Sequence, residues 1–138
     1  MMKNISATLQ PGVYYHIYNR GNNRENLFLE NRNYPYFLTL YEKHVEPIAD
    51  TYAYCLMRNH FHLLVRIKET SQVLKTREVS QKFSNFFNAY TKAINKGYGR
   101  TGSLFEERFG RIPVASTSYF QNLIFYIHFN PQALWELP

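Results

Sequence analysis

The segment that decides the fold is TYAYCLMRNHFHLLVRI, which occupies residues 51–67 at the centre of the chain. Aliphatic and aromatic residues on both sides of a short Arg-Asn pair predict two strands, 51–57 and 61–67, joined as an antiparallel hairpin. Successive side chains of a strand alternate between its faces, so His60 and His62 should point the same way, about 6.6 Å apart along the strand. Two neutral imidazoles that converge from one strand form half of a divalent-metal site. Taken alone, the two residues are explained equally well as half-exposed surface histidines.

The rest of the chain divides into further elements by similar criteria. Aromatic and β-branched residues predict strands, apolar residues at spacings of three and four predict helices, and glycine, asparagine and proline mark the turns. The expected elements are a strand over 13–20, a helix over 31–45, a helix over 73–95, a basic loop over 96–102, a strand over 109–115, and a helix that opens at Ser118 with Gln121 as its capping-box partner and ends at Pro131.

The predicted order is strand, helix, strand, strand, helix, strand and one extra helix. This is the split βαβ order of a ferredoxin-like fold, so we expect an α+β protein whose antiparallel sheet carries helices on one face, plus a C-terminal helix that bears a tyrosine. Both histidines fall on the third strand, where the open face of the sheet could hold a site. With 138 residues and no internal repeat or linker, the chain is expected to be one domain over 1–138.

Composition favours a polyanionic partner. The chain has 16 Lys and Arg against 10 Asp and Glu, a net charge of +6, and 17% of its residues are aromatic. A basic surface attracts phosphates and surplus rings can stack on unpaired bases, so single-stranded nucleic acid is the favoured partner. The lone Cys55 cannot form an internal disulfide, which fits a cytoplasmic setting and a small core residue. No apolar run predicts a membrane span or a signal peptide.

The last predicted helix carries the second informative segment, FYIHFNP at residues 125–131. Tyr126 and Asn130 are one turn apart, about 40° around the helix axis, and therefore share one face. Together they could supply a nucleophilic hydroxyl and an oxygen ligand for a metal. An ordinary tyrosine and a helix C-terminal asparagine explain the same two residues. His128 points away from that face and is expected to be a packing or surface residue.

Several arginines are candidates for contacts with a nucleic-acid backbone. A groove for the strand, with Tyr98 as a stacking surface, could be formed by six basic side chains that are each explained alone as an ordinary surface charge: Arg20, Arg24, Lys96, Arg100, Arg108 and Arg111. Arg58 beside the histidines could touch a phosphate, but a polar hairpin turn explains it equally well. The candidates are Arg20, Arg58, Arg100, Arg108 and Arg111. If the metal needs another ligand, Glu106 and Glu107 are the first to test, although both are expected to be solvated strand-edge residues.

Four segments together resemble a known family. Residues 57–65, MRNHFHLLV, resemble the His-hydrophobic-His motif of the HUH single-strand DNA transposases. Residues 126–131, YIHFNP, resemble the tyrosine motif of the REP-associated tyrosine transposase branch. Residues 102–109, GSLFEERF, are similar to the segment that precedes the last strand in that branch, and residues 13–21 are similar to its opening strand. The resemblance covers nearly the whole chain, with the motifs in the family's order.

The resemblance implies a ferredoxin-like core that cuts and rejoins single-stranded DNA beside a hairpin. It implies that His60, His62 and Asn130 bind a divalent metal, Mg²⁺ or Mn²⁺, and that Tyr126 is the nucleophile that forms a 5′-phosphotyrosine. Histidine ligands favour Mn²⁺, because Mg²⁺ prefers an all-oxygen shell. Relatives often have glutamine or another polar residue in place of Asn130, and many continue with a basic extension beyond the position of Pro138. Some relatives are homodimers that exchange the tyrosine helix, so Tyr126 is expected to act in cis or in trans.

Three alternatives to an active transposase share parts of this pattern. A domesticated, non-catalytic single-stranded DNA-binding protein on the same fold would bind hairpin DNA without needing Tyr126. An HUH replication or mobilisation nickase would carry a similar site, but here the tyrosine motif follows the histidines in a short chain, which favours the transposase branch. A metal-dependent hydrolase that uses His60 and His62 to activate water would leave no covalent protein–DNA product.

Overall fold

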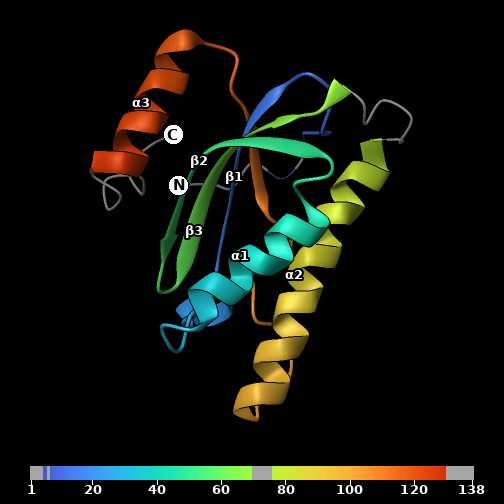
Figure 1. Cartoon of the computed structure of the whole chain (residues 1–138), viewed down its shortest axis with the longest axis vertical. Helices are drawn as coiled ribbons and strands as arrows, with labels where there is room; N and C mark the ends of the chain where they lie inside the picture. The colour runs from blue at the N-terminus through green and yellow to red at the C-terminus, as the bar shows by residue number, and fades with distance from the viewer. Residues whose placement is uncertain (1–4, 6, 70–75, 130–138) are drawn as a thin grey trace.

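The computed structural model describes residues 5, 7–69 and 76–129. Its elements are β1 (Tyr14–Arg20), a short 3-10 helix η1 (Asn22–Arg24), α1 (Asn33–His44), β2 (Ala49–Met57), β3 (His60–Ile67), α2 (Thr76–Tyr98), β4 (Gly110–Pro113) and α3 (Thr117–Phe129). The strands form one sheet in the order β2-β3-β1-β4, and neighbouring strands are antiparallel (Figure 1). This arrangement confirms the predicted α+β, ferredoxin-like fold. None of the described helices has the length and apolar character that crossing a bilayer requires.

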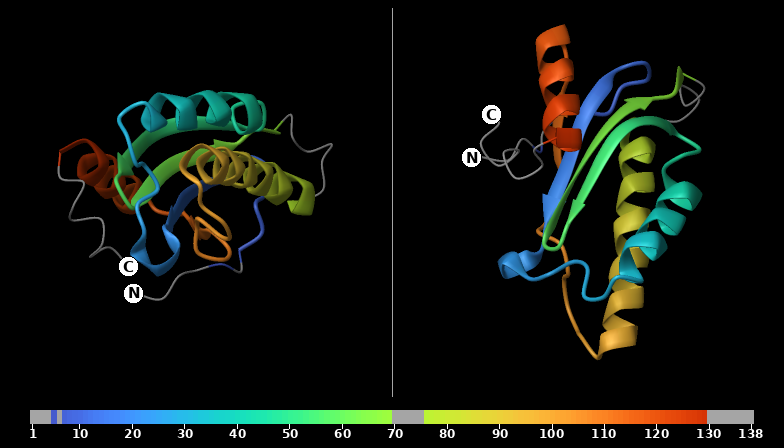
Figure 2. Two further views of the ribbon diagram at one scale, coloured as in Figure 1. Left: turned by 90° about the horizontal axis from the view of Figure 1, so that it is seen from below. Right: turned by 60° about the vertical axis from the view of Figure 1, so that its left-hand side comes forward.

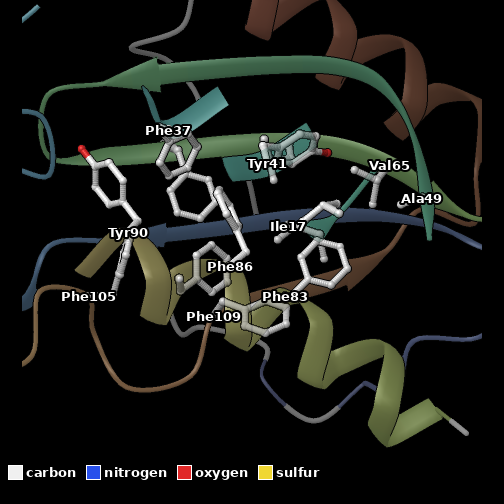
Figure 3. Packing of buried hydrophobic residues seen from close by; sticks show 14 of the residues in the cluster. Ile17, Phe37, Tyr41, Ala49, Val65, Phe83, Phe86, Tyr90, Phe105 and Phe109 are labelled. Atoms are coloured by element: carbon white, nitrogen blue, oxygen red, sulfur yellow. The ribbon is translucent and has the colours of Figure 1, made fainter. Parts of the chain in front are cut away.

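One face of the sheet carries α1, α2 and an aromatic core (Figure 3). Phe37 of α1 lies 4.8 Å from Phe86 and 5.1 Å from Tyr90 of α2, measured between ring centroids, and both pairs are edge-to-face. Edge-to-face contacts between aromatic rings are favourable beyond the burial of their surface. The apolar stripe predicted on the second helix is buried throughout, in Val79, Phe83, Phe86, Phe87, Tyr90 and Ile94.

Phe86→Ala should lower the free energy of unfolding by about 3–5 kcal/mol, because it removes a fully buried ring from contacts with several others. Urea denaturation of the variant and the parent measures the loss. Tyr54→Ala is the control, since Tyr54 is 49% exposed and should change stability by about 0.5 kcal/mol or less. A loss at Phe86 no larger than the loss at Tyr54 would contradict this description of the core.

The other face of the sheet is covered in part by α3. Leu123 and Ile127 of α3 are buried against Leu64 of β3 and against Ala53 and Cys55 of β2. The right-hand view of Figure 2 shows α3 on the opposite side of the sheet from α1 and α2. The face that was expected to be open therefore carries the tyrosine-bearing helix, and the burial of Cys55 confirms that it is a core residue.

The ends of two helices differ from the prediction. The helix expected to stop at residue 95 continues to Tyr98, and Gly99 then adopts a positive φ of 63°, which a residue without a Cβ accepts readily. The N–H of Arg100 donates to the carbonyl of Asn95 at 3.0 Å, which closes the helix in the manner of a Schellman motif. The basic loop is correspondingly shorter than expected. The predicted start of this helix at residues 73–75 lies outside the described residues.

The N-cap of the last helix also differs from the prediction and lies two residues earlier in the sequence. Ser116, and not Ser118, accepts a hydrogen bond from the backbone N–H of Tyr119, with 3.1 Å between the atoms. A side-chain oxygen at the N-cap normally accepts from the third helical residue, and α3 begins at Thr117 as this geometry requires. The expected end of the helix at Pro131 lies outside the described residues.

Candidate metal and nucleophile site

The two motif histidines lie at the start of β3 and share one face of the sheet, as strand alternation predicts. His60 is 5% exposed and His62 is 1% exposed, and their ring centroids are 5.3 Å apart. Nδ1 of His60 is 2.8 Å from Oδ1 of Asn59, and Nδ1 of His62 is 2.9 Å from Nε2 of His16. The Nε2 atoms of both motif histidines are buried. Because the Nδ1 atoms have partners within the protein, Nε2 is the nitrogen that each ring could offer to a metal.

Burial keeps these imidazoles neutral. It lowers the pKa of His60 to about 4, with the charge of Arg20 as a second cause. It also lowers the pKa of His62 to about 2, with smaller contributions from His16 and His60. Neutral imidazole is the protonation state that binds metals, so the pair fits a divalent ion without first losing protons at neutral pH.

The neighbouring side chains complete only part of a metal site. Among the described residues, no group of three His, Cys, Asp or Glu side chains forms a metal-binding cluster. Cys55 pairs with His62 across β2 and β3, but burial raises the pKa of its thiol and so disfavours the thiolate that metals bind. Asn130, the predicted oxygen ligand, lies outside the described residues. Among the described residues of the predicted ligand set, this face of the sheet therefore offers the two histidines.

Tyr126 lies on α3 and is half-buried against the cluster that joins this helix to the sheet. The cluster includes Leu64, which lies on the same face of β3 as both motif histidines because the three positions alternate by two. Leu123 and Ile127, one turn before Tyr126 and directly after it, anchor the helix there. The helix that bears Tyr126 and the two predicted histidine ligands thus lie on one face of the sheet.

Two of the five predicted DNA-contacting arginines lie beside His60. Arg20 pairs with His60 across β1 and β3, and its Nε donates to Oε2 of Glu106 at 2.6 Å. Arg58 is exposed in the two-residue turn that precedes His60. Glu106 is half-buried in this ion pair, so the expectation of a solvated edge residue was wrong for Glu106, whereas Glu107 is exposed as expected.

The other three arginines occupy different surroundings. Arg100 forms an ion pair with Glu25, with 2.9 Å between the atoms, and Arg108 is exposed with a positive φ of 59°. Arg111 is 9% exposed. It points to the face of the sheet that carries α1 and α2, because its cross-strand partner Ile17 belongs to the core on that face. Its guanidinium lies 3.8 Å over the ring of Phe109, and its Nη1 donates to Oγ of Ser80 at 3.0 Å. A contact between Arg111 and DNA stays a prediction, and this packing does not favour it.

Two further residues lie beside the histidines although no local sequence pattern marks them: His16 on β1 and Tyr119 on α3. His16 is 1% exposed, and its ring connects His62 to the Tyr119 hydroxyl through its two nitrogens. Tyr18 lies next to them, and its ring is stacked on that of His62, with 6.1 Å between the ring centroids. A Cβ at Gly110 would lie 2.3 Å from Cζ of Tyr18, so glycine on β4 makes room for this ring. Alternation along β1 puts His16 and Tyr18 on one face, but only the register across strands shows their neighbours.

We expect the metal-free protein to lose stability between pH 7 and pH 5. Burial lowers the pKa of His16 to about 3, while the unfolded chain has the ordinary value of 6.5, so in this range the unfolded state binds the additional proton. The free energy of unfolding should fall by about 2 kcal/mol for one such histidine. Urea denaturation with a chelator present measures the fall, and His16→Gln should reduce it. Equal stability at the two pH values would contradict a buried neutral His16.

Comparison with known proteins connects this geometry to a family. The family described as IS200-like transposases matches residues 10–130, a range that contains every element from β1 to α3. Among solved structures, the chain is similar to a REP-associated tyrosine transposase bound to a REP hairpin. The TM-score is 0.63 and the identity is 15%, over 94% of this chain and 73% of the other, so the likeness concerns the fold. No curated protein matches the sequence. The chain belongs to the IS200-like family of transposases, and DNA is its partner.

Proposed function

We propose that the protein cleaves and rejoins single-stranded DNA beside a hairpin, with Tyr126 as the nucleophile and with a divalent metal on His60 and His62. The observation that carries the proposal is the shared sheet face: α3, which bears Tyr126, packs on Leu64 two residues after His62. The structural relative that binds a REP hairpin supports a hairpin as the recognised DNA feature.

In the proposed reaction a phosphotyrosine bond replaces the phosphodiester bond that is broken. The Tyr126 hydroxyl gives up its proton, and its oxygen attacks phosphorus in the scissile phosphodiester. The bond between phosphorus and the 3′ oxygen breaks, the 3′ oxygen takes a proton, and the 5′ phosphate stays on the tyrosine. In the reverse step a 3′-hydroxyl attacks this phosphotyrosine and releases the tyrosine, so strands are joined without ATP.

His60 and His62 would hold the metal through Nε2. When bound, the ion would polarise the scissile phosphate and offset charge on its non-bridging oxygens. Asn59 accepts a hydrogen bond from Nδ1 of His60 in the tautomer whose lone pair is on Nε2, and this bond fixes the orientation of the ring. Asn130 is proposed as a further ligand, and Mn²⁺ suits the histidine pair better than Mg²⁺.

Arg20 and Arg58 are proposed to bind the DNA backbone next to the scissile phosphate. Their support is position: Arg20 is the cross-strand neighbour of His60, and Arg58 precedes it in the turn. Guanidinium groups bind phosphate oxygens strongly, and Glu106 holds the Arg20 side chain in place. Arg100 and Arg108 are proposed to contact the strand farther from the site.

A covalent-adduct assay tests the proposed function. The full chain is mixed with labelled single-stranded hairpin oligonucleotides, taken from DNA flanking its own gene, with Mn²⁺ or Mg²⁺. An adduct that survives a denaturing gel and requires both Tyr126 and His60 is expected. Hairpin binding without any adduct would instead indicate a non-catalytic binding protein, and cleavage without an adduct would indicate a metal-dependent hydrolase.

We further propose that Tyr126 acts in cis, because α3 packs on the sheet of its own chain. Co-expression of Tyr126→Phe with His62→Ala tests this, since each chain lacks one half of the site. The mixture should form no adduct if each chain completes its own site. Recovery of adduct in the mixture would show that two chains exchange α3.

A further inference from the structure

His16 connects the metal-ligand strand to the nucleophile helix. It lies on β1 between β3 and β4, is 1% exposed, and has a hydrogen-bond partner at each ring nitrogen. Nε2 is 2.9 Å from Nδ1 of His62, and Nδ1 is 3.0 Å from the hydroxyl oxygen of Tyr119. Because both nitrogens are engaged within the protein, His16 can support a metal ligand but is not itself placed to be one.

Tyr119 carries this connection into α3. It lies seven residues, about two turns, before Tyr126, so the two tyrosines are on nearly the same side of the helix. Tyr119 is half-buried, and its hydroxyl reaches the centre of the sheet face through His16. The chain of contacts from His62 to Tyr119 therefore crosses from the strand that would hold the metal to the helix that bears the nucleophile.

Metal binding would fix the positions of the imidazole protons of His62 and His16. A ligand Nε2 on His62 must carry no proton, so the single proton of that neutral ring is on Nδ1 and is donated to Nε2 of His16. His16 is neutral as well, and its own proton must then be on Nδ1. That N–H donates to the Tyr119 oxygen, which acts as the acceptor. Only one of the two tautomers of His16 is compatible with an occupied site.

We propose that His16 is a positioning residue that couples occupation of the His60–His62 metal site to the docking of α3, through Tyr119. The inference rests on the proposed function in one respect, that His62 binds the metal through Nε2. The coupling must be reciprocal: whatever strengthens the contact between His16 and Tyr119 strengthens metal binding, and the metal in turn holds α3 against the sheet. The nucleophile would thus be best ordered when the metal is present.

Metal affinity gives the first measurement, with Mn²⁺ alone as the probe and electron paramagnetic resonance of the free ion as the readout. Tyr119→Phe keeps the ring and removes the acceptor, and it should weaken Mn²⁺ binding by about 2- to 10-fold, the worth of one hydrogen bond. His16→Leu should weaken it by about 10- to 100-fold, as loss of a partner of a ligating histidine does. His16→Gln, with an amide that can accept and donate, should recover part of the loss. Tyr54→Phe is the matched control, because Tyr54 of β2 is exposed, and it should bind Mn²⁺ as the parent does.

Two spectroscopic measurements separate coupling from simple loss of packing. Long-range ¹H–¹⁵N correlation with Zn²⁺ as a diamagnetic probe should show the proton of both His62 and His16 on Nδ1. Hydrogen exchange should show that metal slows exchange in α3 of the parent but not of Tyr119→Phe. A proton on Nε2 of His16 in the metal-bound protein would overturn the proposal.

The outcomes also separate this inference from the proposed function. If His62→Ala abolishes Mn²⁺ binding while His16→Leu and Tyr119→Phe bind as the parent does, the positioning role is overturned and the metal site stands. If the parent binds neither Mn²⁺ nor Zn²⁺, both the positioning role and the metal part of the proposed function are overturned. Adduct formation that depends on Tyr126 would still stand in that case.

Discussion

Tyr126→Phe should abolish strand cleavage and adduct formation, by more than about 10³-fold, while hairpin binding is nearly unchanged. The substitution removes the oxygen that attacks phosphorus. It leaves the ring half-buried against the apolar cluster between α3 and the sheet. Rates of cleavage of a labelled hairpin oligonucleotide, measured beside the binding affinity for the same DNA, give both quantities. Measuring both quantities matters because a misfolded variant would lose DNA binding as well as cleavage.

Tyr54→Phe is the matched control for Tyr126→Phe, since Tyr54 is exposed on β2 and its hydroxyl has no part in the proposed chemistry. It should cleave at the parental rate. Cleavage by Tyr126→Phe at a comparable rate would show that another group, or water, attacks the phosphate.

His62→Ala should weaken Mn²⁺ binding by more than about 100-fold and remove metal-dependent cleavage. The expected loss exceeds the 10- to 100-fold effect of removing a ligand's hydrogen-bond partner, because a ligand itself is removed. Isothermal titration with Mn²⁺ measures the affinity, and circular dichroism verifies that the variant remains folded. His128→Ala is the control: His128 is exposed on α3 and should leave Mn²⁺ affinity unchanged. Parental Mn²⁺ affinity in His62→Ala would contradict the assignment of the ligand pair.

The fold and the facing of the motif histidines could be predicted from local pattern. Alternation along one strand is enough to put His60 and His62 on a common face, and the order of elements is enough for the ferredoxin-like sheet. The aromatic stripe of α2 also follows from spacing alone, because a helix repeats every 3.6 residues. Each of these inferences depends on residues close together in the sequence.

The surroundings of the histidines depend on contacts between distant segments. His16 and His62 are 46 residues apart, and His16 and Tyr119 are 103 apart, so their contacts follow from strand register and helix docking. The same limit applies to Arg111, whose charge predicted a surface but whose register on β4 turns it toward Ser80. The side of the sheet on which α3 docks is likewise set by Leu123 and Ile127 meeting Leu64, a contact that no local pattern specifies.

The proposed reaction attaches DNA to one particular tyrosine among twelve. Tandem mass spectrometry of the trypsin-digested adduct tests it most directly. Trypsin cuts after Arg111 and places Tyr119 and Tyr126 in one peptide that begins at Ile112, so fragment ions must locate the modified residue. We predict a nucleotide mass on Tyr126 and an unmodified Tyr119. A nucleotide on any other residue, or cleaved DNA with no modified peptide, would show that Tyr126 is not the nucleophile.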